Sequence, residues 1–265
     1  MANTRIIALT IASAALAALA AQPRAQATPF VERPLVLPRS QWALDTGLGI
    51  GHLDRPSPAD DINGLGLNLE LRGGVSEAVQ IGVRTGFRLG SDGRATEADR
   101  FGRTFETETY GTGADTVANP ELSLRLAVVR TEAVGLGLEG RLYVPIEDGT
   151  KIGTMIALPL HFHLGERARL ETGVYVPIIF TDPRISVVSF PLHLWIQATD
   201  SVALGPLTGV RLHYPGGSTS IPLGAGLNYA VSHEADLRAW LLFPNVKGSG
   251  SRDYFGFGVG LEPRF

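Results

Sequence analysis

Apolar and polar residues alternate along most of this chain. In residues 254–265, four apolar side chains (Phe255, Phe257, Val259 and Leu261) fall on one side of an extended backbone, and glycine or polar residues fall on the other side. Successive side chains of a strand point to opposite faces, so this period of two predicts a strand with one apolar face. The pattern predicts twelve strands, over residues 41–52, 64–72, 78–89, 121–129, 134–146, 154–164, 168–180, 186–198, 202–214, 221–231, 236–243 and 254–265. The strands at 202–214 and 236–243 alternate less cleanly, and we expect a bulge in either.

The strand faces opposite the apolar ones carry charges and histidines. In residues 64–72, for example, Leu65, Leu67 and Leu69 alternate with Asn68 and Glu70. The chain is 44% hydrophobic and contains 32 glycines, and its apolar residues are dispersed instead of gathered in long runs. A soluble β-sandwich or barrel is the alternative, but its outward residues would be polar. The pattern favours the inside-out arrangement of a membrane barrel, with apolar residues toward lipid and polar residues inside.

Short turns recur along the chain at nearly equal intervals. The segments 130–133, 165–168, 199–202 and 232–235 start 33 to 35 residues apart. A repeated strand–turn–strand unit is what a closed meander requires. We therefore predict an all-β fold, a closed antiparallel up-and-down transmembrane β-barrel of about 12 strands. The longest connection, 91–119, either folds into the mouth as a constriction or lies over the outer surface.

The last strand resembles the closing strand of Gram-negative outer-membrane β-barrels. It is amphipathic and ends on the aromatic residue Phe265, which in that superfamily serves as the assembly signal. The resemblance implies the outer membrane of a Gram-negative bacterium, contact with outer-membrane lipid, and recognition of the C-terminal strand by the barrel assembly machinery. The superfamily has many functions, so the resemblance indicates the kind of protein more clearly than its activity.

The N-terminal segment predicts export. Arg5 precedes an apolar stretch over residues 6–20, and Ala25-Gln26-Ala27 forms a small-x-small cleavage site. That stretch is shorter than the roughly 20 residues needed to span a bilayer. We expect a signal peptide over residues 1–27, a proline-containing periplasmic lead-in over 28–39, and the barrel over 40–265.

Composition and short motifs argue against several classes of function. The chain has no cysteine and a formal net charge of −3, and it has no basic cluster, so we expect no nucleic-acid partner and no thiolate metal site. The G-x-G-x-x-G pattern at 135–140 lies within a predicted strand and opens no helix, which argues against a nucleotide site. His161 and His163 share a face, but Arg169 is expected nearby and argues against a bound cation. We expect no cofactor and no metal.

The predicted lumen is polar and of mixed charge. It either forms a water-filled path that selects solutes, or it is filled by Arg–Glu pairs that hold the barrel shut. Twelve strands lie between the filled eight-stranded barrels and the open 16–18-stranded porins. We favour a narrow channel for passive passage of small polar solutes or ions. The candidate pore-lining residues are Glu70, Arg72, Arg84, Arg88, Arg125, Glu139, Arg141, His161, His163, Arg169, Glu171 and His193.

Two other functions stay open. The first is a structural or plugged barrel without transport. The second, less favoured, is a lipid-modifying outer-membrane hydrolase, which would need a nucleophile and a base within hydrogen-bond reach. His213 and residues 218–220 suggest such a pair but fit a turn more simply, and we expect no enzyme. The pattern names neither the solute nor the oligomeric state.

Overall fold

The computed structural model describes residues 28–53, 62–90, 117–146, 152–180, 185–214, 216–247 and 254–265. The predicted signal peptide and most of the long connection at 91–119 lie outside these residues, and the predictions made for them stay predictions. No helix in the described ranges is long and apolar enough to cross a membrane.

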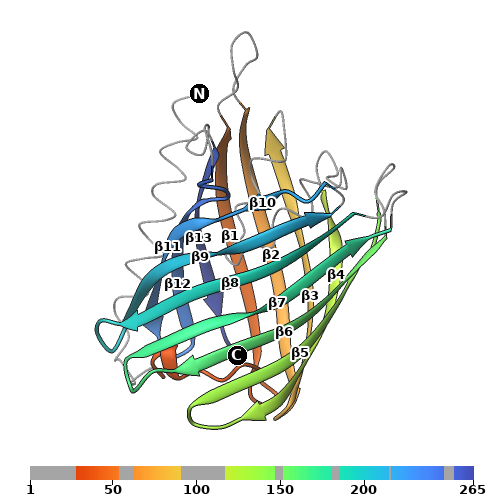
Figure 1. Cartoon of the computed structure of the whole chain (residues 1–265). Coiled ribbons are helices and arrows are strands. Elements are labelled where there is room, and N and C mark those ends of the chain that lie inside the picture. The colour runs from red at the N-terminus through yellow and green to blue at the C-terminus, as the bar shows by residue number, and fades with distance from the viewer. Residues whose placement is uncertain are drawn as a thin grey trace, which may run out of the picture.

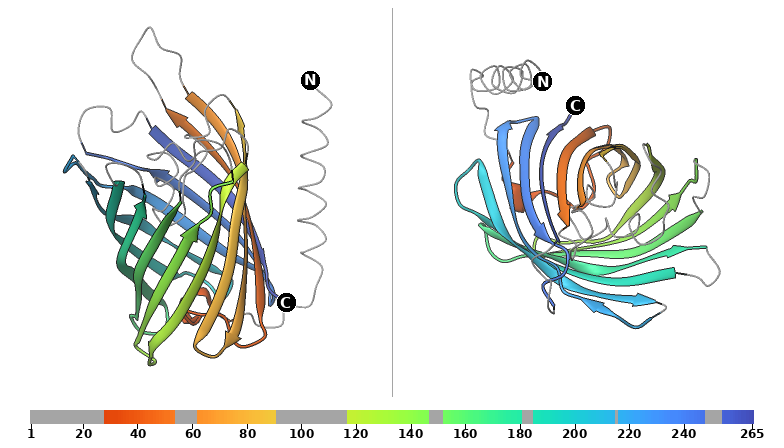
Figure 2. Two further views of the ribbon diagram at one scale, coloured as in Figure 1. Left: turned by 90° about the vertical axis from the view of Figure 1, so that its right-hand side faces the viewer. Right: turned by 90° about the horizontal axis from the view of Figure 1, so that it is seen from above.

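The chain forms one antiparallel meander of twelve long strands (Figure 1). Each long strand pairs with the next along the chain, and β13 pairs with β1, so the sheet closes on itself (Figure 2). The fold prediction is confirmed. The strands are β1 Trp42–Leu53, β2 Ile62–Ser76, β3 Val79–Gly90, β4 Val117–Arg130, β5 Val134–Tyr143, β6 Gly153–His163, β7 Ala168–Ile179, β8 Ile185–Gln197, β9 Val202–Tyr214, β11 Leu223–Ser232, β12 Ala235–Phe243 and β13 Tyr254–Pro263, with a two-residue piece, β10 Thr219–Ser220, paired to β9.

The two faces of the barrel wall differ in the predicted way. Leu48, Phe87 and Leu138 are exposed on the outside, although they are large and apolar. Asp45 and Glu139 are buried on the inside. A closed sheet pairs its own strand edges, and an apolar exterior suits hydrocarbon instead of water. The wall therefore has the solvation pattern of a membrane-spanning barrel.

Irregularities in the ladders only partly match the predicted bulges. A register shift between Ala230 and Ser232 lies in the pairing of β11 with β12, next to the expected position in the strand at 236–243. Strand β9 instead contains Gly209 at φ 159°, opposite Pro191 of β8. Further shifts occur in the pairings of β2 with β3, β3 with β4 and β4 with β5. The strand pattern located most elements correctly but did not locate these local insertions.

The segment before β1 lies inside the barrel. It enters at the end where the short turns between paired strands lie, here called the turn end, and includes the short 3₁₀ helix η1, Phe30–Glu32 (Figures 1 and 2). Val31 and Val36 are buried. The amide of Val31 donates to Gln197 Oε1 at 3.3 Å, and the amide of Leu37 donates to Gln80 Oε1 at 2.9 Å. Residues 28–38, here called the N-terminal segment, therefore line the lumen at this end.

A glycine in the wall makes room for the N-terminal segment. A Cβ on Gly74 would collide with the backbone carbonyls of Leu37 and Pro38. The amide of Ser40 donates to the Gly74 carbonyl at 2.8 Å, and the amide of Gly74 donates to the Gln41 carbonyl at 2.9 Å. The chain thus passes directly against β2 as it turns from the lumen into β1.

Candidate functional site

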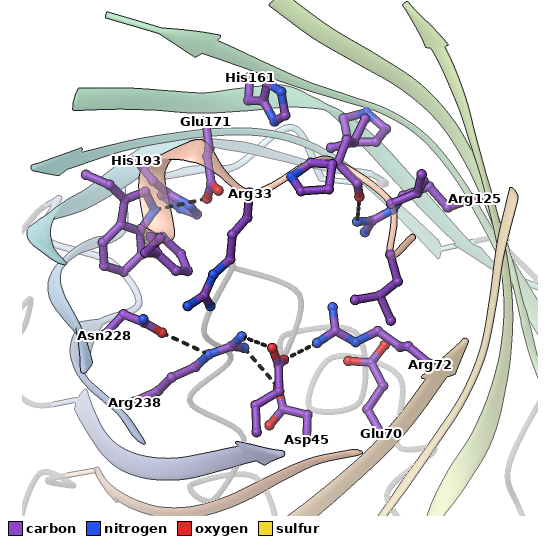
Figure 3. Close-up of a pocket in the computed structure, with 18 of the residues that line it drawn as sticks. Arg33, Asp45, Glu70, Arg72, Arg125, His161, Glu171, His193, Asn228 and Arg238 are labelled. Carbon is purple, nitrogen blue, oxygen red and sulfur yellow. Dashed lines mark hydrogen bonds and ion pairs between the residues drawn. The ribbon is translucent and has the colours of Figure 1, made fainter. Parts of the chain in front are cut away.

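The predicted pore residues converge on one cavity. Ten of the twelve candidates line a cavity of about 340 Å³ inside the barrel, which Figure 3 shows in close-up. They come from strands β2 to β8, because every second residue of each strand points inward. The His163 ring lies 4.8 Å from that of His161, but His163 is not among the cavity-lining residues. The side chain of Arg88 lies outside the described part of the chain. The ten are Glu70, Arg72, Arg84, Arg125, Glu139, Arg141, His161, Arg169, Glu171 and His193.

One group of charges on β2 to β5 is centred on Arg141. Its Nε donates to Glu139 at 2.7 Å, and its Nη1 donates to Glu121 at 2.8 Å. Glu70 accepts a longer contact of 3.4 Å from Nη2. Arg125 donates to the other oxygen of Glu139 at 2.8 Å. With Arg84 near Glu121, the group holds three arginines and three glutamates, so its formal charge is zero.

A second group of charges joins β1, β2, β12 and β13 to the N-terminal segment. Arg238 donates to Glu262 at 2.6 Å and to Asp45 at 3.1 Å. Arg72 also pairs with Glu262. These contacts bring the first two and the last two long strands of the chain to one patch of the lumen wall. Asn228 lies beside this patch, and its Oδ1 accepts from Arg238 Nε at 3.3 Å (Figure 3).

Arg33 connects the N-terminal segment to this second group. Its guanidinium pairs with Asp236, with an Nη2–Oδ1 distance of 2.9 Å, and Asp236 also accepts from Arg264 at 2.6 Å. Burial lowers the pKa of Arg33, and the hydrogen bond to Asp236 opposes that effect. In Figure 3, Arg33 lies between Glu171 and His193 on one side and Arg238 and Asp45 on the other. A residue outside the strands therefore reaches the middle of the lumen.

An aromatic cluster holds the first turn of the N-terminal segment. The Phe30 ring packs edge-on against Trp195, with centroids 4.9 Å apart. The Arg169 guanidinium lies over the Phe30 ring, 4.5 Å from the centroid. Trp195 Nε1 donates to Glu171 at 3.0 Å, and Glu171 accepts from Arg169 at 2.5 Å. The buried members of the cluster are Val31, Trp195, Leu207 and Trp240.

Two of the histidines lie beside charges of both signs. His161 pairs across the ladder with Glu171, and His163 pairs with Arg169. Gly135 makes room for the His161 ring, because a Cβ there would collide with it. In the described ranges, no group of three or more His, Asp or Glu side chains has an arrangement that could hold a metal ion.

The hydrolase candidate has one supporting contact. His213 Nε2 lies 3.0 Å from Ser220 Oγ. Ser220 pairs with the buried Arg211, which lies two residues before His213 on the same face of β9. The Ser–His pair therefore faces the lumen. A hydrolase of membrane lipids would need this pair on the lipid side of the wall.

Sequence reasoning missed the contribution of the N-terminal segment to the lumen. It placed residues 28–39 before the barrel, whereas Phe30 and Arg33 line the cavity. The available signal was an apolar pattern, Phe30, Val31 and Leu35 to Leu37, in a stretch with too many prolines for a strand. Such residues need burial somewhere, but the sequence does not show which surface provides it.

The fold is shared with several solved outer-membrane channels. No family model matches the sequence, and no curated protein matches it. An outer-membrane channel from Pseudomonas putida F1 aligns over 89% of this chain and 98% of its own, with a TM-score of 0.59 and 12% identity. The NanC porin aligns over 83% and 98%, with a TM-score of 0.58 and 6% identity. KdgM porin, solved with disordered oligogalacturonate, aligns over 84% and 99%, with a TM-score of 0.57 and 8% identity. At these identities the likeness concerns the fold.

Proposed function

We propose that this protein is an outer-membrane channel for passive passage of small polar solutes or ions. The observation that carries the proposal is the lumen itself. Its cavity of about 340 Å³ is lined by arginines, carboxylates and histidines, inside a wall that is apolar on the outside. A polar path through an apolar layer lowers the barrier for polar solutes that cannot dissolve in hydrocarbon. The shared fold of the NanC and KdgM porins supports this proposal.

The channel is narrow for two structural reasons. Twelve strands enclose much less space than the 16–18 strands of open porins. The N-terminal segment occupies part of this space at the turn end, where Phe30 and Val31 pack against Trp195 and Leu207. We expect solutes of monosaccharide size to pass and oligosaccharides to pass far more slowly.

The amphipathic last strand supports the outer-membrane location. Phe265 is exposed, and its backbone exchanges hydrogen bonds with Trp42 at 2.8 and 2.9 Å. Its aromatic side chain is therefore accessible at the turn end. We propose that the barrel assembly machinery recognises this strand, and that the turn end faces the periplasm.

A plugged barrel without transport is the second candidate. The N-terminal segment is anchored by hydrogen bonds to Gln80 and Gln197 and by the pair between Arg33 and Asp236. A segment held this firmly could close the lumen. The lumen-facing position of His213 and Ser220 gives no comparable support to a lipid hydrolase.

Swelling of liposomes that contain the folded protein separates these functions. We expect arabinose to enter quickly, and we expect the trisaccharide raffinose to enter at a rate near that of empty liposomes. Equal, background rates for both sugars would contradict passive passage and favour the plugged barrel. Rapid entry of raffinose would contradict the narrow lumen.

A further inference from the structure

Arg33 of the N-terminal segment adds a positive charge to the cavity. Among the described residues, the barrel wall supplies three arginines and three carboxylates to the second group of charges, so this part of the group is formally neutral. Arg33 joins it through Asp236 and adds one positive charge. The group around Arg141 and the pair of Arg169 with Glu171 are each neutral. The wall residues of this group are Arg72, Arg238, Asp45, Asp236 and Glu262 from the strands, and Arg264 directly after β13.

The second group presents its arginines, not its carboxylates, to the lumen. The side chains of Arg33, Arg72 and Arg238 are 14 to 20% exposed, whereas the carboxylates with which they pair are 0 to 4% exposed. A solute in the cavity therefore meets guanidinium groups whose counterions are covered. Arg33, Arg72 and Arg238 are here called the arginine cluster.

We infer that the arginine cluster is a binding site for a small monovalent carboxylate, and that Arg33 of the N-terminal segment makes the channel prefer anions. This inference rests on the proposed channel function and names its solute class. One carboxylate balances the charge that Arg33 adds to the second group. Planar guanidinium groups bind carboxylates with paired hydrogen bonds, and weakly hydrated guanidinium tolerates the partly buried position. The Phe30 ring lies 5.5 Å from the Arg33 guanidinium and offers an apolar surface beside it.

Ion selectivity tests the role of Arg33. In a planar bilayer with a KCl gradient, we expect the wild-type reversal potential to indicate chloride preference. Arg33→Gln should remove most of this preference, Arg33→Lys should retain it, and Arg33→Glu should reverse it. Arg39→Gln is the matched control, because Arg39 belongs to the same stretch of chain, is exposed and does not line the cavity. Equal selectivity in wild type and Arg33→Gln, or the same shift in Arg39→Gln, would overturn the inference.

Loss of the Asp236 contact could also release the N-terminal segment. Release would raise the conductance of Arg33→Gln and Arg33→Glu to the same extent and leave their selectivity alike. A direct charge effect instead separates the two variants in selectivity. The comparison therefore distinguishes a charged selectivity residue from a purely structural anchor.

Equilibrium binding tests the site without requiring conduction. Propionate should change the tryptophan fluorescence of the folded protein saturably at low salt, because Trp195 contacts Phe30 within the same cavity. Propionamide, which lacks the charge, should produce no such change, and Arg33→Gln should lose the propionate response. If the folded barrel gives no current but binds propionate, the proposed channel function is wrong and the proposed carboxylate site still stands. Absence of saturable propionate binding to the wild type would overturn the site.

Discussion

Arg141 shows how charged side chains remain inside the barrel wall. It is buried, yet three glutamates lie within 3.4 Å of its guanidinium. Removing one partner of a buried ion pair leaves an unpaired charge, which typically costs about 3–5 kcal/mol. The pairing therefore explains why so many charges are compatible with a folded barrel.

Neighbouring residues of β2 give the sharpest test of which face meets lipid. Leu67 pairs with Leu48 and Phe87, both exposed on the outside, whereas Asn68 lines the cavity. Leu67→Arg should destabilise the inserted barrel by roughly 2–4 kcal/mol if it lies near the bilayer midplane. Asn68→Arg should be tolerated, because it adds a charge to an already polar lumen. Urea unfolding of both variants in lipid vesicles measures the difference.

Equal stability of these two variants would contradict the assignment of the faces. Because the two positions are adjacent in one strand, a difference in distance from the turns does not explain an unequal result. The comparison therefore isolates the environment of each side chain.

At the scale of elements, strands β6 to β9 share an irregularity at prolines. Pro159 of β6 lies opposite Gly173 of β7, and Pro191 of β8 lies opposite Gly209 of β9. Both glycines have positive φ, 149° and 159°. Proline has no amide hydrogen for the ladder, and a Cβ on Gly173 would lie 2.5 Å from the Leu158 carbonyl oxygen and 3.1 Å from Pro159 Cα. Because glycine has no Cβ, the two neighbouring strands can approach each other closely where a proline lies opposite it.

Gly173→Ala should destabilise the barrel by about 1–3 kcal/mol, because alanine is strained at this φ and crowds β6. Gly140→Ala in β5 is the control, since a Cβ there has nothing within 4 Å. Unfolding midpoints of the two variants measure the effect. A loss in Gly140→Ala as large as that in Gly173→Ala would contradict the packing explanation.

The strands were predictable because alternation is local and repeats along the chain. Residues 202–214 were predicted as one strand and form β9, Val202–Tyr214. Strand β4 begins at Val117, four residues before the expected start, because Val117 and Ala118 continue the ladder with β3 beyond a register shift. The predicted strand 221–231 begins two residues later, as β11 at Leu223, and the short β10 that precedes it pairs with β9. The exact ends of a strand depend on the strands with which it pairs, and the alternation within one strand does not indicate those partners.

The lumen was predictable only as far as strands supply it. Glu70 and Arg72 were expected to face inward, because their positions alternate with apolar residues. Arg33 was not, because residues 28–38 have no strand pattern and their burial depends on the closed barrel around them. Which arginine pairs with which carboxylate also depends on strands that meet only after closure, such as β2 and β13 in the pair of Arg72 with Glu262.

At the scale of the whole molecule, the N-terminal segment controls the width of the lumen at the turn end. Deletion of residues 28–38 should leave the strand ladders intact, since these residues belong to none of them. It should raise single-channel conductance severalfold, because Phe30, Val31 and Arg33 no longer occupy the lumen. Heat-modifiable gel migration checks that the shortened barrel is folded. A folded deletion variant with unchanged conductance would contradict the constriction.

The conductance of residues 28–265, refolded and inserted in a planar bilayer, tests the central claim most directly. A narrow, charged lumen predicts small, reproducible current steps that scale with salt concentration. A folded protein that inserts and gives no current steps would contradict the channel and favour a plugged, structural barrel.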